Sequence, residues 1–121
     1  GVPVERVDDE YSTDFMKCVE LVRSSDHQSQ EQLQTNNLGV VALGGTGGRF
    51  DQSMSSIHHL YILNRVRRAI LVSDESIVVV LGAGKHEITC NLDIEGPTCG
   101  IIPVGSSEAT LTTTGFQWDV G

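Results

Sequence analysis

A glycine-rich stretch at residues 44–48 (GGTGG) constrains this chain more than any other feature of its sequence. It follows a short apolar run at residues 38–43, which predicts a buried strand. Residues 49–52 (RFDQ) lead from the glycines into a helical pattern. Strand, glycine loop and helix in this order form the layout in which α/β folds place ligands, at the carboxyl ends of strands. We therefore expect a ligand site at this loop.

Two charged residues directly after the glycines indicate the kind of ligand. Glycine lets the backbone adopt positive φ and approach a ligand closely. Arg49 offers a fork of donors suited to phosphate, and Asp51 offers a hard oxygen suited to Mg²⁺. The alternative is a tight strand-to-helix turn in which Arg49 and Asp51 only pair with each other and cap the helix. The loop has neither the Lys-Ser/Thr ending of a Walker loop nor a GxGxxG pattern, so neither of those motifs applies.

A first helix is expected to begin after Ser12 and Thr13, which are good N-cap residues, with Asp14 in its first turn. Its apolar stripe follows helical spacing and contains Phe15, Cys18, Val19 and Val22. Asp14 has two interpretations. It either helps Asp51 to hold Mg²⁺ or orients a hydroxyl nucleophile, or it is simply part of a helix cap, which is the favoured reading for Asp14 taken alone.

A second helix is predicted at residues 51–64, and its buried face is expected to contain Met54, Ile57, Tyr61 and also Leu60. His58 and His59 are adjacent and therefore point in different directions. We expect solvated or capping roles for both.

From residue 66 onwards, short apolar runs alternate with turns, which is typical of an antiparallel sandwich or barrel. The runs are at residues 69–72, 77–81, 86–92, 100–104 and 109–120. The predicted fold class is α/β followed by all-β, with residues 1–65 as the last part of an α/β domain and residues 66–121 as a β-sandwich. Trp118, the only tryptophan, is either a core residue or a stacking surface for a flat cationic ligand.

The overall composition narrows the functional class. At 121 residues the chain is about one domain in size, and its 8 Lys and Arg against 16 Asp and Glu give a net charge of −8, which argues against a nucleic-acid surface. No apolar run is long enough for a membrane span, and no signal peptide is recognisable. The three cysteines have no metal-binding spacing and are expected to be reduced, partly buried thiols of a cytoplasmic protein. Because the sequence begins without Met and ends in a strand-like pattern, we expect a fragment of a longer protein.

Four segments together resemble one known family. They are residues 12–17 (STDFMK), 44–52 (GGTGGRFDQ), 99–105 (CGIIPVG) and 113–118 (TTGFQW). Their order and spacing are similar to those of thiamine pyrophosphokinases, with eukaryotic and particularly fungal members looking most similar. The resemblance covers essentially the whole chain.

The resemblance implies an α/β nucleotide-binding domain followed by a β-sandwich, in a homodimer with active sites at the subunit interface. It implies transfer of the β,γ-diphosphate of ATP to the hydroxyl of thiamine, with Mg²⁺, giving thiamine diphosphate and AMP. Asp14 and Asp51 match acidic positions tied to Mg²⁺, phosphate or thiamine, and Arg49 matches a phosphate-contacting arginine accompanied by Gln52. Thr114 and Trp118 match the thiamine pocket of the sandwich, contributed from the partner subunit.

The chain departs from the family pattern in three places. An acidic motif of the Gly-Asp-x-Asp-Ser type and a final strand with Ser and Asn residues are both absent, and Glu10-Tyr11 stands where many members have Gln-Asp. We therefore expect activity of the parent protein but no product from this chain alone. The alternatives are a non-catalytic remnant that only binds a ligand or a partner subunit, and a different nucleotide-using transferase that shares the glycine loop.

Overall fold

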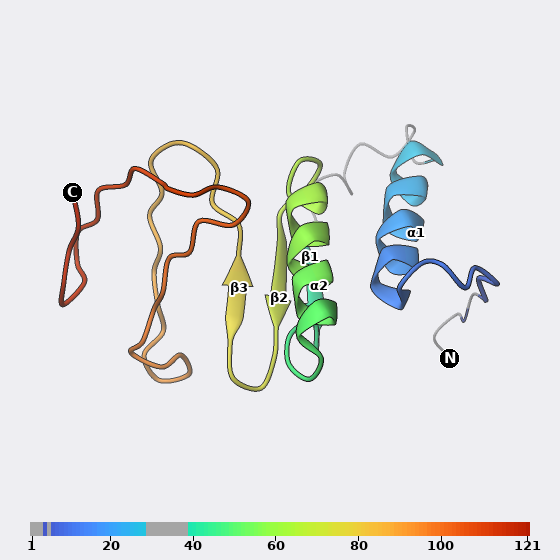
Figure 1. The fold of residues 1–121 in the computed structure, drawn as a ribbon, viewed down its shortest axis with the longest axis horizontal. Coiled ribbons are helices and arrows are strands. Elements are labelled where there is room, and N and C mark those ends of the chain that lie inside the picture. Colours follow the sequence, from blue (N-terminus) through green and yellow to red (C-terminus); the bar gives the residue numbers. More distant parts are fainter. Residues whose placement is uncertain (1–3, 5, 29–38) are drawn as a thin grey trace. The chain divides into compact units, whose positions relative to one another are not determined.

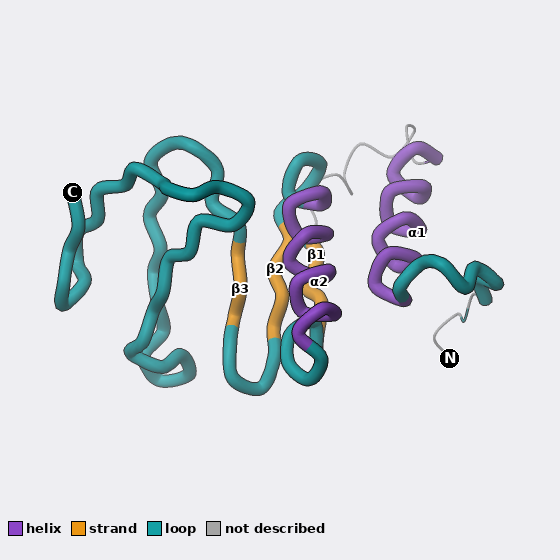
Figure 2. Tube along the Cα trace, in the orientation of Figure 1, coloured by secondary structure: helices purple, strands orange, loops and turns teal. Residues whose placement is uncertain are grey.

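The computed structural model describes residue 4 and residues 6–28 and 39–121. The chain divides into two compact units, Gly1–Gly84 and Lys85–Gly121. The helices and strands named below all belong to the first unit (Figures 1 and 2). Neither helix in the described part of the chain combines the length and apolar character that a membrane crossing needs.

Helix α1 spans Asp14–Gln28, and α2 spans Phe50–Leu63, so both predicted helices are confirmed. The start of α1 is set locally, because the backbone N–H of Met16 donates to Oγ1 of Thr13 at 3.2 Å. Along the expected stripe of α1, Val19 is buried and Phe15 is half-buried, whereas Cys18 is exposed.

A three-stranded sheet contains β1 (Val40–Leu43), β2 (Ala69–Val72) and β3 (Ile77–Val79) in that order. The predicted strand before the glycine loop is confirmed over β1, while residue 38 lies outside the described residues. Strands β1 and β2 are parallel, with Val40 opposite Ala69, and α2 makes the crossover between them. Strands β2 and β3 form an antiparallel hairpin, with Val72 opposite Ile77.

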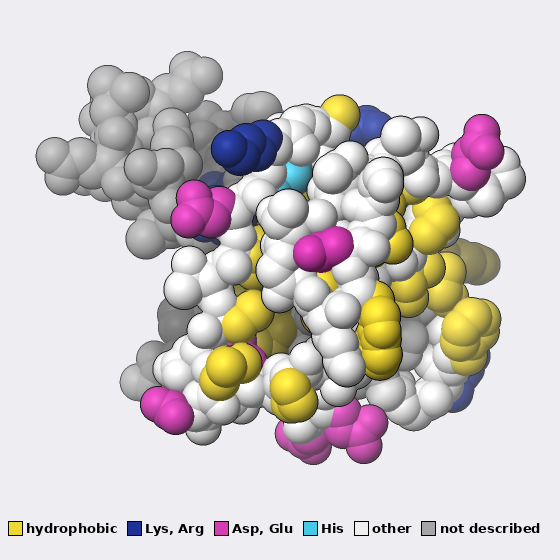
Figure 3. Space-filling model, turned by 90° about the vertical axis from the view of Figure 1, so that its left-hand side faces the viewer, with side chains coloured by type: hydrophobic (Ala, Val, Ile, Leu, Met, Phe, Trp, Pro, Cys, Tyr) yellow, Lys and Arg dark blue, Asp and Glu magenta, His cyan; other side chains and the backbone are white. Residues whose placement is uncertain are grey.

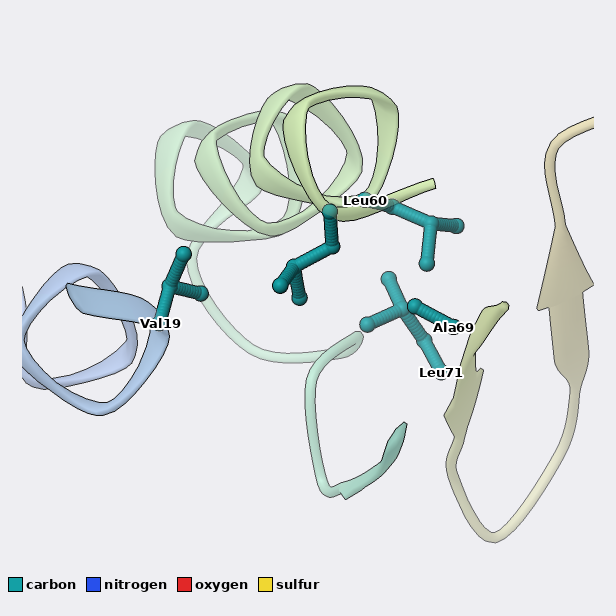
Figure 4. Packing of buried hydrophobic residues seen from close by; sticks show 5 residues of the cluster. Val19, Leu60, Ala69 and Leu71 are labelled. Atoms are coloured by element: carbon teal, nitrogen blue, oxygen red, sulfur yellow. The ribbon is translucent and has the colours of Figure 1, made fainter. Parts of the chain in front are cut away.

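The core lies between one face of this sheet and the two helices. Leu60, Leu63 and Leu71 are fully buried, and Val19 and Ala69 join them. Figure 4 shows Val19 reaching from α1 towards α2, and Ala69 and Leu71 reaching from β2 towards the same helix. Full burial of each leucine side chain is worth about 1.5–3 kcal/mol relative to exposure. These contacts hold α2 against β2 on one side and against α1 on the other.

The buried face of α2 differs in part from the predicted one. Leu60 is buried as expected and Ile57 packs against the core, but Met54 is 37% exposed and Tyr61 is 39% exposed. The prediction for Met54 and Tyr61 is wrong because the apolar residues of α2 occupy more than one stripe. Packing against α1 and β2 selects the stripe that also contains Ser56 and Leu63.

The later part of the chain also differs from the expectation. Strand β2, expected to open a β-sandwich, pairs in parallel with β1, so the first sheet continues beyond residue 65. The run at residues 77–81 is a strand only over β3. In the described structure, residues 85–121 contain no strand, and the runs at 86–92, 100–104 and 109–120 are loops (Figure 2).

The apolar runs of the second unit are not covered by a packed layer, and they do not pair as β-strands. Large apolar side chains of the second unit remain exposed, among them Leu92, Ile94, Ile102 and Trp118. Hydrophobic side chains also reach the surface on the face drawn in Figure 3. A segment this short cannot bury enough apolar surface to order a sandwich by itself. The β-sandwich therefore remains an expectation.

Candidate active site

The glycine loop begins where β1 ends and is shaped by backbone conformation. Gly44, Gly47 and Gly48 have φ values of +71°, +106° and +66°, a region that L side chains rarely adopt. The N–H of Gly44 donates to the carbonyl of Val72 at 2.8 Å, which continues the β1–β2 pairing into the loop. A Cβ at Gly45 would lie 3.2 Å from a methyl carbon of Leu71, so the loop passes close over the core.

Ser53 connects this loop to helix α2. Its Oγ accepts the N–H of Gly47 at 3.1 Å, while its own N–H donates to the carbonyl of Arg49 at 3.2 Å in the first turn of the helix. The side chain therefore joins the middle of the loop to the start of the helix. A serine at this position was not identified from the sequence, although serine hydroxyls commonly bond nearby backbone groups.

Arg49 and Asp51 form an exposed ion pair with each other. Arg49 Nε donates to Oδ1 of Asp51 at 3.0 Å, and Nη2 donates to Oδ2 at 2.5 Å. This hydrogen bonding lowers the pKa of the Asp51 carboxyl and raises the pKa of the Arg49 guanidinium. The pairing half of the simple-turn alternative is thus observed. Arg49, the N-cap residue, makes no side-chain cap hydrogen bond. Asp51 lies in the first turn of α2, where backbone N–H groups of Gln52 and Asp51 also help to lower its pKa.

Asp14 lies at the start of α1 with its carboxylate fully exposed. It forms an ion pair with Lys17, with Nζ 3.5 Å from Oδ1. The helix is capped by Thr13 rather than by Asp14. The Asp14 carboxylate is consequently accessible to a ligand.

Several structural elements around the glycine loop line a common cavity of about 350 Å³. It lies between the start of α1, the end of β1, the glycine loop and the first turns of α2, and its lining includes Asp14, Phe15, Gly44, Gly47, Gln52 and Ser53. The structure thus brings Asp14, Gln52 and the glycine loop together. Among the described residues, Arg49 and Asp51 do not line the cavity, although both lie within the loop-to-helix segment beside it.

A second cavity of about 460 Å³ lies between residues 7–12, α1 and α2, and His59 lines it. The expectation of a solvated or capping role is wrong for His59, which is only 6% exposed, whereas His58 is exposed. The Nδ1 of His59 is 2.7 Å from the carbonyl of Ser55, and its ring packs edge-on against Phe15 with centroids 5.7 Å apart. His59 is therefore part of the α1–α2 interface.

In the acidic segment before α1, residues 8–10, Asp9 accepts hydrogen bonds from two nearby residues. Its carboxylate accepts the hydroxyl of Ser12 and the N–H of Tyr11, the latter at 2.9 Å. These hydrogen bonds, that of Ser12 first, lower the pKa of Asp9.

Thr114 and Trp118 lie in the second unit, and both side chains are exposed, Trp118 at 79%. Both belong to a loop closed by Asp119, whose carboxylate accepts three hydrogen bonds from Thr113, Gly115 and Phe116. The N–H of Phe116 is the largest cause of the lowered pKa of Asp119. Asp119 was not identified as a site residue, although aspartate side chains commonly accept hydrogen bonds from backbone groups in turns.

Metal-binding groups are sparse in the described part of the chain. No three His, Cys, Asp or Glu side chains there come together as a metal site. Cys18, Cys90 and Cys99 are free, and all three are exposed, so their expected partial burial is wrong. Their positions lie on an exposed helix face and in loops, where no core forms around them.

A parallel strand pair, a glycine loop and a cavity at the carboxyl end of β1 define an α/β unit with a candidate ligand site, followed in the chain by a separate second unit. Comparison with known families agrees with this class. The model described as thiamin pyrophosphokinase, catalytic domain, matches residues 1–72, and the thiamin pyrophosphokinase vitamin B1 binding domain matches residues 85–121. The chain belongs to the thiamine pyrophosphokinase family.

Curated relatives carry the same family name. Thiamine pyrophosphokinase 1 of Oryza sativa subsp. japonica is 39% identical over 97% of this chain, and thiamine pyrophosphokinase 1 of Arabidopsis thaliana is 36% identical over 97%. Thiamine pyrophosphokinase of Saccharomyces cerevisiae is 26% identical over 92% of the chain. The rice and Arabidopsis proteins share more identity with this chain than the yeast protein does.

The chain spans less than half of the length of these relatives, with 43%, 42% and 47% of the rice, Arabidopsis and yeast proteins covered.

Proposed function

We propose that the protein carrying this sequence is a thiamine pyrophosphokinase, which transfers the diphosphate of ATP to the hydroxyl of thiamine. The hydroxyl oxygen forms a bond to the β-phosphorus, and the bond from that phosphorus to the α,β-bridging oxygen breaks. The electron pair leaves with AMP, and the hydroxyl proton is released. The observation that carries this proposal is the match of both parts of the chain, in order, to the catalytic and vitamin B1 binding domains of one family.

The cavity at the glycine loop supports binding of the ATP phosphates in the first unit. Its backbone is open and free of side chains at Gly44 and Gly47, and a Cβ at either position would meet no atom within 4 Å. We assign Arg49 to the phosphates, because transfer of a phosphoryl group needs its spread negative charge to be neutralised. Gln52 lines the same cavity and is assigned to the same ligand.

The donor set also fits a magnesium ion bound together with ATP. Mg²⁺ commonly uses one or two carboxylates plus substrate phosphates, and Asp14 and Asp51 offer carboxylates at the two helix starts around the glycine loop. When bound, the ion would neutralise phosphate charge. Asp14 alternatively orients the thiamine hydroxyl, because its carboxylate is exposed and it lines the cavity.

Thiamine is assigned to the second unit, at Thr114 and Trp118. The thiazolium ring of thiamine is cationic and flat, and an exposed tryptophan face is a suitable partner for it. We further propose that the protein is a homodimer, in which the partner subunit supplies this loop to each active site. Sedimentation of the full-length protein tests the dimer, and a monomer that retains full turnover would contradict it.

We propose a domain boundary after residue 65. Residues 1–65 bind ATP and residues 66–121 bind thiamine. Limited proteolysis with mapped cleavage sites tests this boundary. Cleavage confined to residues 65–68 would support it. Cleavage near Gly84 would instead place the boundary after the sheet, where the two compact units divide.

The activity is tested by incubating the full-length protein with ATP, thiamine and Mg²⁺ and measuring AMP and thiamine diphosphate. We expect both products in equal amounts, and only when thiamine is present. AMP formation without thiamine would indicate a different nucleotide-using transferase. Thiamine binding without any product would favour the non-catalytic alternative.

A further inference from the structure

The loop that carries Thr114 and Trp118 is closed at its base by two residues outside the predicted site. The N–H of Thr113 donates to the carbonyl of Val120 at 2.8 Å, and the N–H of Val120 donates to Oγ1 of Thr113 at 2.9 Å. The two ends of the loop are therefore held side by side. The hydroxyl of Thr113 in turn donates to Oδ1 of Asp119 at 3.1 Å.

Asp119 holds the far side of the same loop. Its Oδ2 accepts the N–H of Gly115 at 3.1 Å, and its Oδ1 accepts the N–H of Phe116 at 3.1 Å. Gly115 has a φ of +102°, so the chain reverses at this point and turns its amides towards the carboxylate. The aspartate thus ties together the entry, the turn and the exit of one loop.

The two residues assigned to thiamine make no such contribution to the loop. Among the described residues, the structure gives no hydrogen bond to the side chain of Thr114 or of Trp118, and both side chains are exposed. Their orientation therefore depends on the backbone that Asp119 and Thr113 hold. An aromatic face preorganised in this way loses less conformational freedom when a ligand binds.

We propose that Asp119 is a positioning residue for thiamine binding, and that its carboxylate holds the loop of residues 113–120 in the conformation that presents Thr114 and Trp118 to the cation. Thr113 acts with it through its hydroxyl. The inference rests on the proposed function, because it takes thiamine as the ligand of this loop.

A second role for Asp119 has to be separated from this one, because a carboxylate also attracts a cationic ligand through its charge. Asn in its place keeps the shape but presents an NH₂ group instead of one of the two oxygens, so one accepted hydrogen bond becomes a contact between two donors. Glu108→Gln removes the same amount of charge from an exposed position in the same unit. The two variants are therefore matched in net charge and differ in the loop contacts.

Thr113 provides a pair of variants that change no charge. Thr113→Val removes the hydroxyl and keeps the branched shape, whereas Thr113→Ser keeps the hydroxyl. If the hydroxyl matters through its bonds to Asp119 and Val120, serine restores what valine removes. This pair keeps the inference testable if Asp119→Asn does not fold.

Trp118 supplies the reporter, because it is the only tryptophan of the chain. Its fluorescence is titrated with thiamine in the full chain and in the four variants. We expect thiamine to quench the wild-type emission, and Asp119→Asn and Thr113→Val to raise the thiamine Kd by on the order of tenfold. Glu108→Gln and Thr113→Ser are expected to bind within about twofold of the wild type, as surface changes usually do.

In the full-length enzyme, Asp119→Asn is expected to raise the KM for thiamine and to leave the KM for ATP unchanged, a split that general destabilisation would not produce. If the wild type binds thiamine and Asp119→Asn binds it equally well, or if Glu108→Gln weakens binding as much, the inference is overturned. If the wild type neither binds thiamine nor forms product, the proposed function itself fails.

Discussion

Arg49 and Asp51 hold each other by two hydrogen bonds immediately after the glycine loop, with 3.0 Å from Nε to Oδ1 and 2.5 Å from Nη2 to Oδ2. These are the two groups assigned to phosphate and to Mg²⁺. Each charged group is thus partnered by the other. The proposed binding of ATP would have to share or replace this pair, which makes its two members the first targets for mutation.

Asp51→Asn is expected to abolish turnover of the full-length protein with little loss of fold. The carboxylate is exposed, so its removal leaves no unsatisfied buried group, while a carboxylate proposed to hold Mg²⁺ at the phosphates is lost. Steady-state turnover and thermal unfolding measure the two effects. Asp74→Asn, an exposed carboxylate in the β2–β3 turn, is the control. Near-normal turnover of Asp51→Asn would contradict the role assigned to Asp51.

The pH dependence of the pair follows from the lowered pKa of Asp51. Because the folded-state pKa lies below the unfolded value, the stabilisation is present above the unfolded pKa and is lost as the pH falls through the folded one. We expect an NMR titration of the Asp51 carboxyl carbon to give a midpoint below the ordinary aspartate value. Arg49→Gln should return that midpoint to the ordinary range. An unchanged midpoint in Arg49→Gln would show that Arg49 is not the cause.

Ser53→Ala is expected to raise the KM for ATP by roughly fivefold, the effect of losing one hydrogen bond worth about 1 kcal/mol. The reason is that Oγ of Ser53 holds the N–H of Gly47 in the loop that lines the cavity. Ser53→Thr retains the hydroxyl and should remain near the wild-type value. Kinetics of the full-length protein provide the measurement. Equal KM values for the alanine and threonine variants would exclude a positioning role for the hydroxyl.

Leu60→Ala is expected to lower the free energy of unfolding by about 2–5 kcal/mol, because it empties a fully buried position between α2 and the sheet. Tyr61→Ala, at the next position along the helix, should cost clearly less since Tyr61 is 39% exposed. Urea unfolding followed by circular dichroism compares the two. Equal losses would mean that α2 buries a different face.

Local patterns in the sequence predicted the elements whose causes are local. Thr13 caps α1 through the N–H of Met16, and positive φ at Gly44 and Gly47 turns the chain out of β1. Each of these features depends on residues a few positions apart, so the residue types alone indicated them. The start of α1, the first strand, the glycine loop and both ends of α2 therefore lie close to their predicted positions.

Contacts between residues far apart in the chain could not be predicted from the sequence in the same way. The sequence could not show that β2 pairs with β1, that α2 turns Leu60 inwards and Tyr61 outwards, or that Ser53 reaches Gly47. The role of Asp119 was missed for the same reason, since the sequence does not state which donors a carboxylate meets.

The sequence by itself determined the family, the glycine loop and the identity of the candidate groups, because chemistry and short-range geometry are properties of residue types and spacing. Only the tertiary structure decided which groups meet. It placed Asp14 and Gln52 in one cavity and paired Arg49 with Asp51. The physical reason is that burial and pairing depend on which surfaces pack together, and that choice is made by the whole folded unit rather than by any single segment.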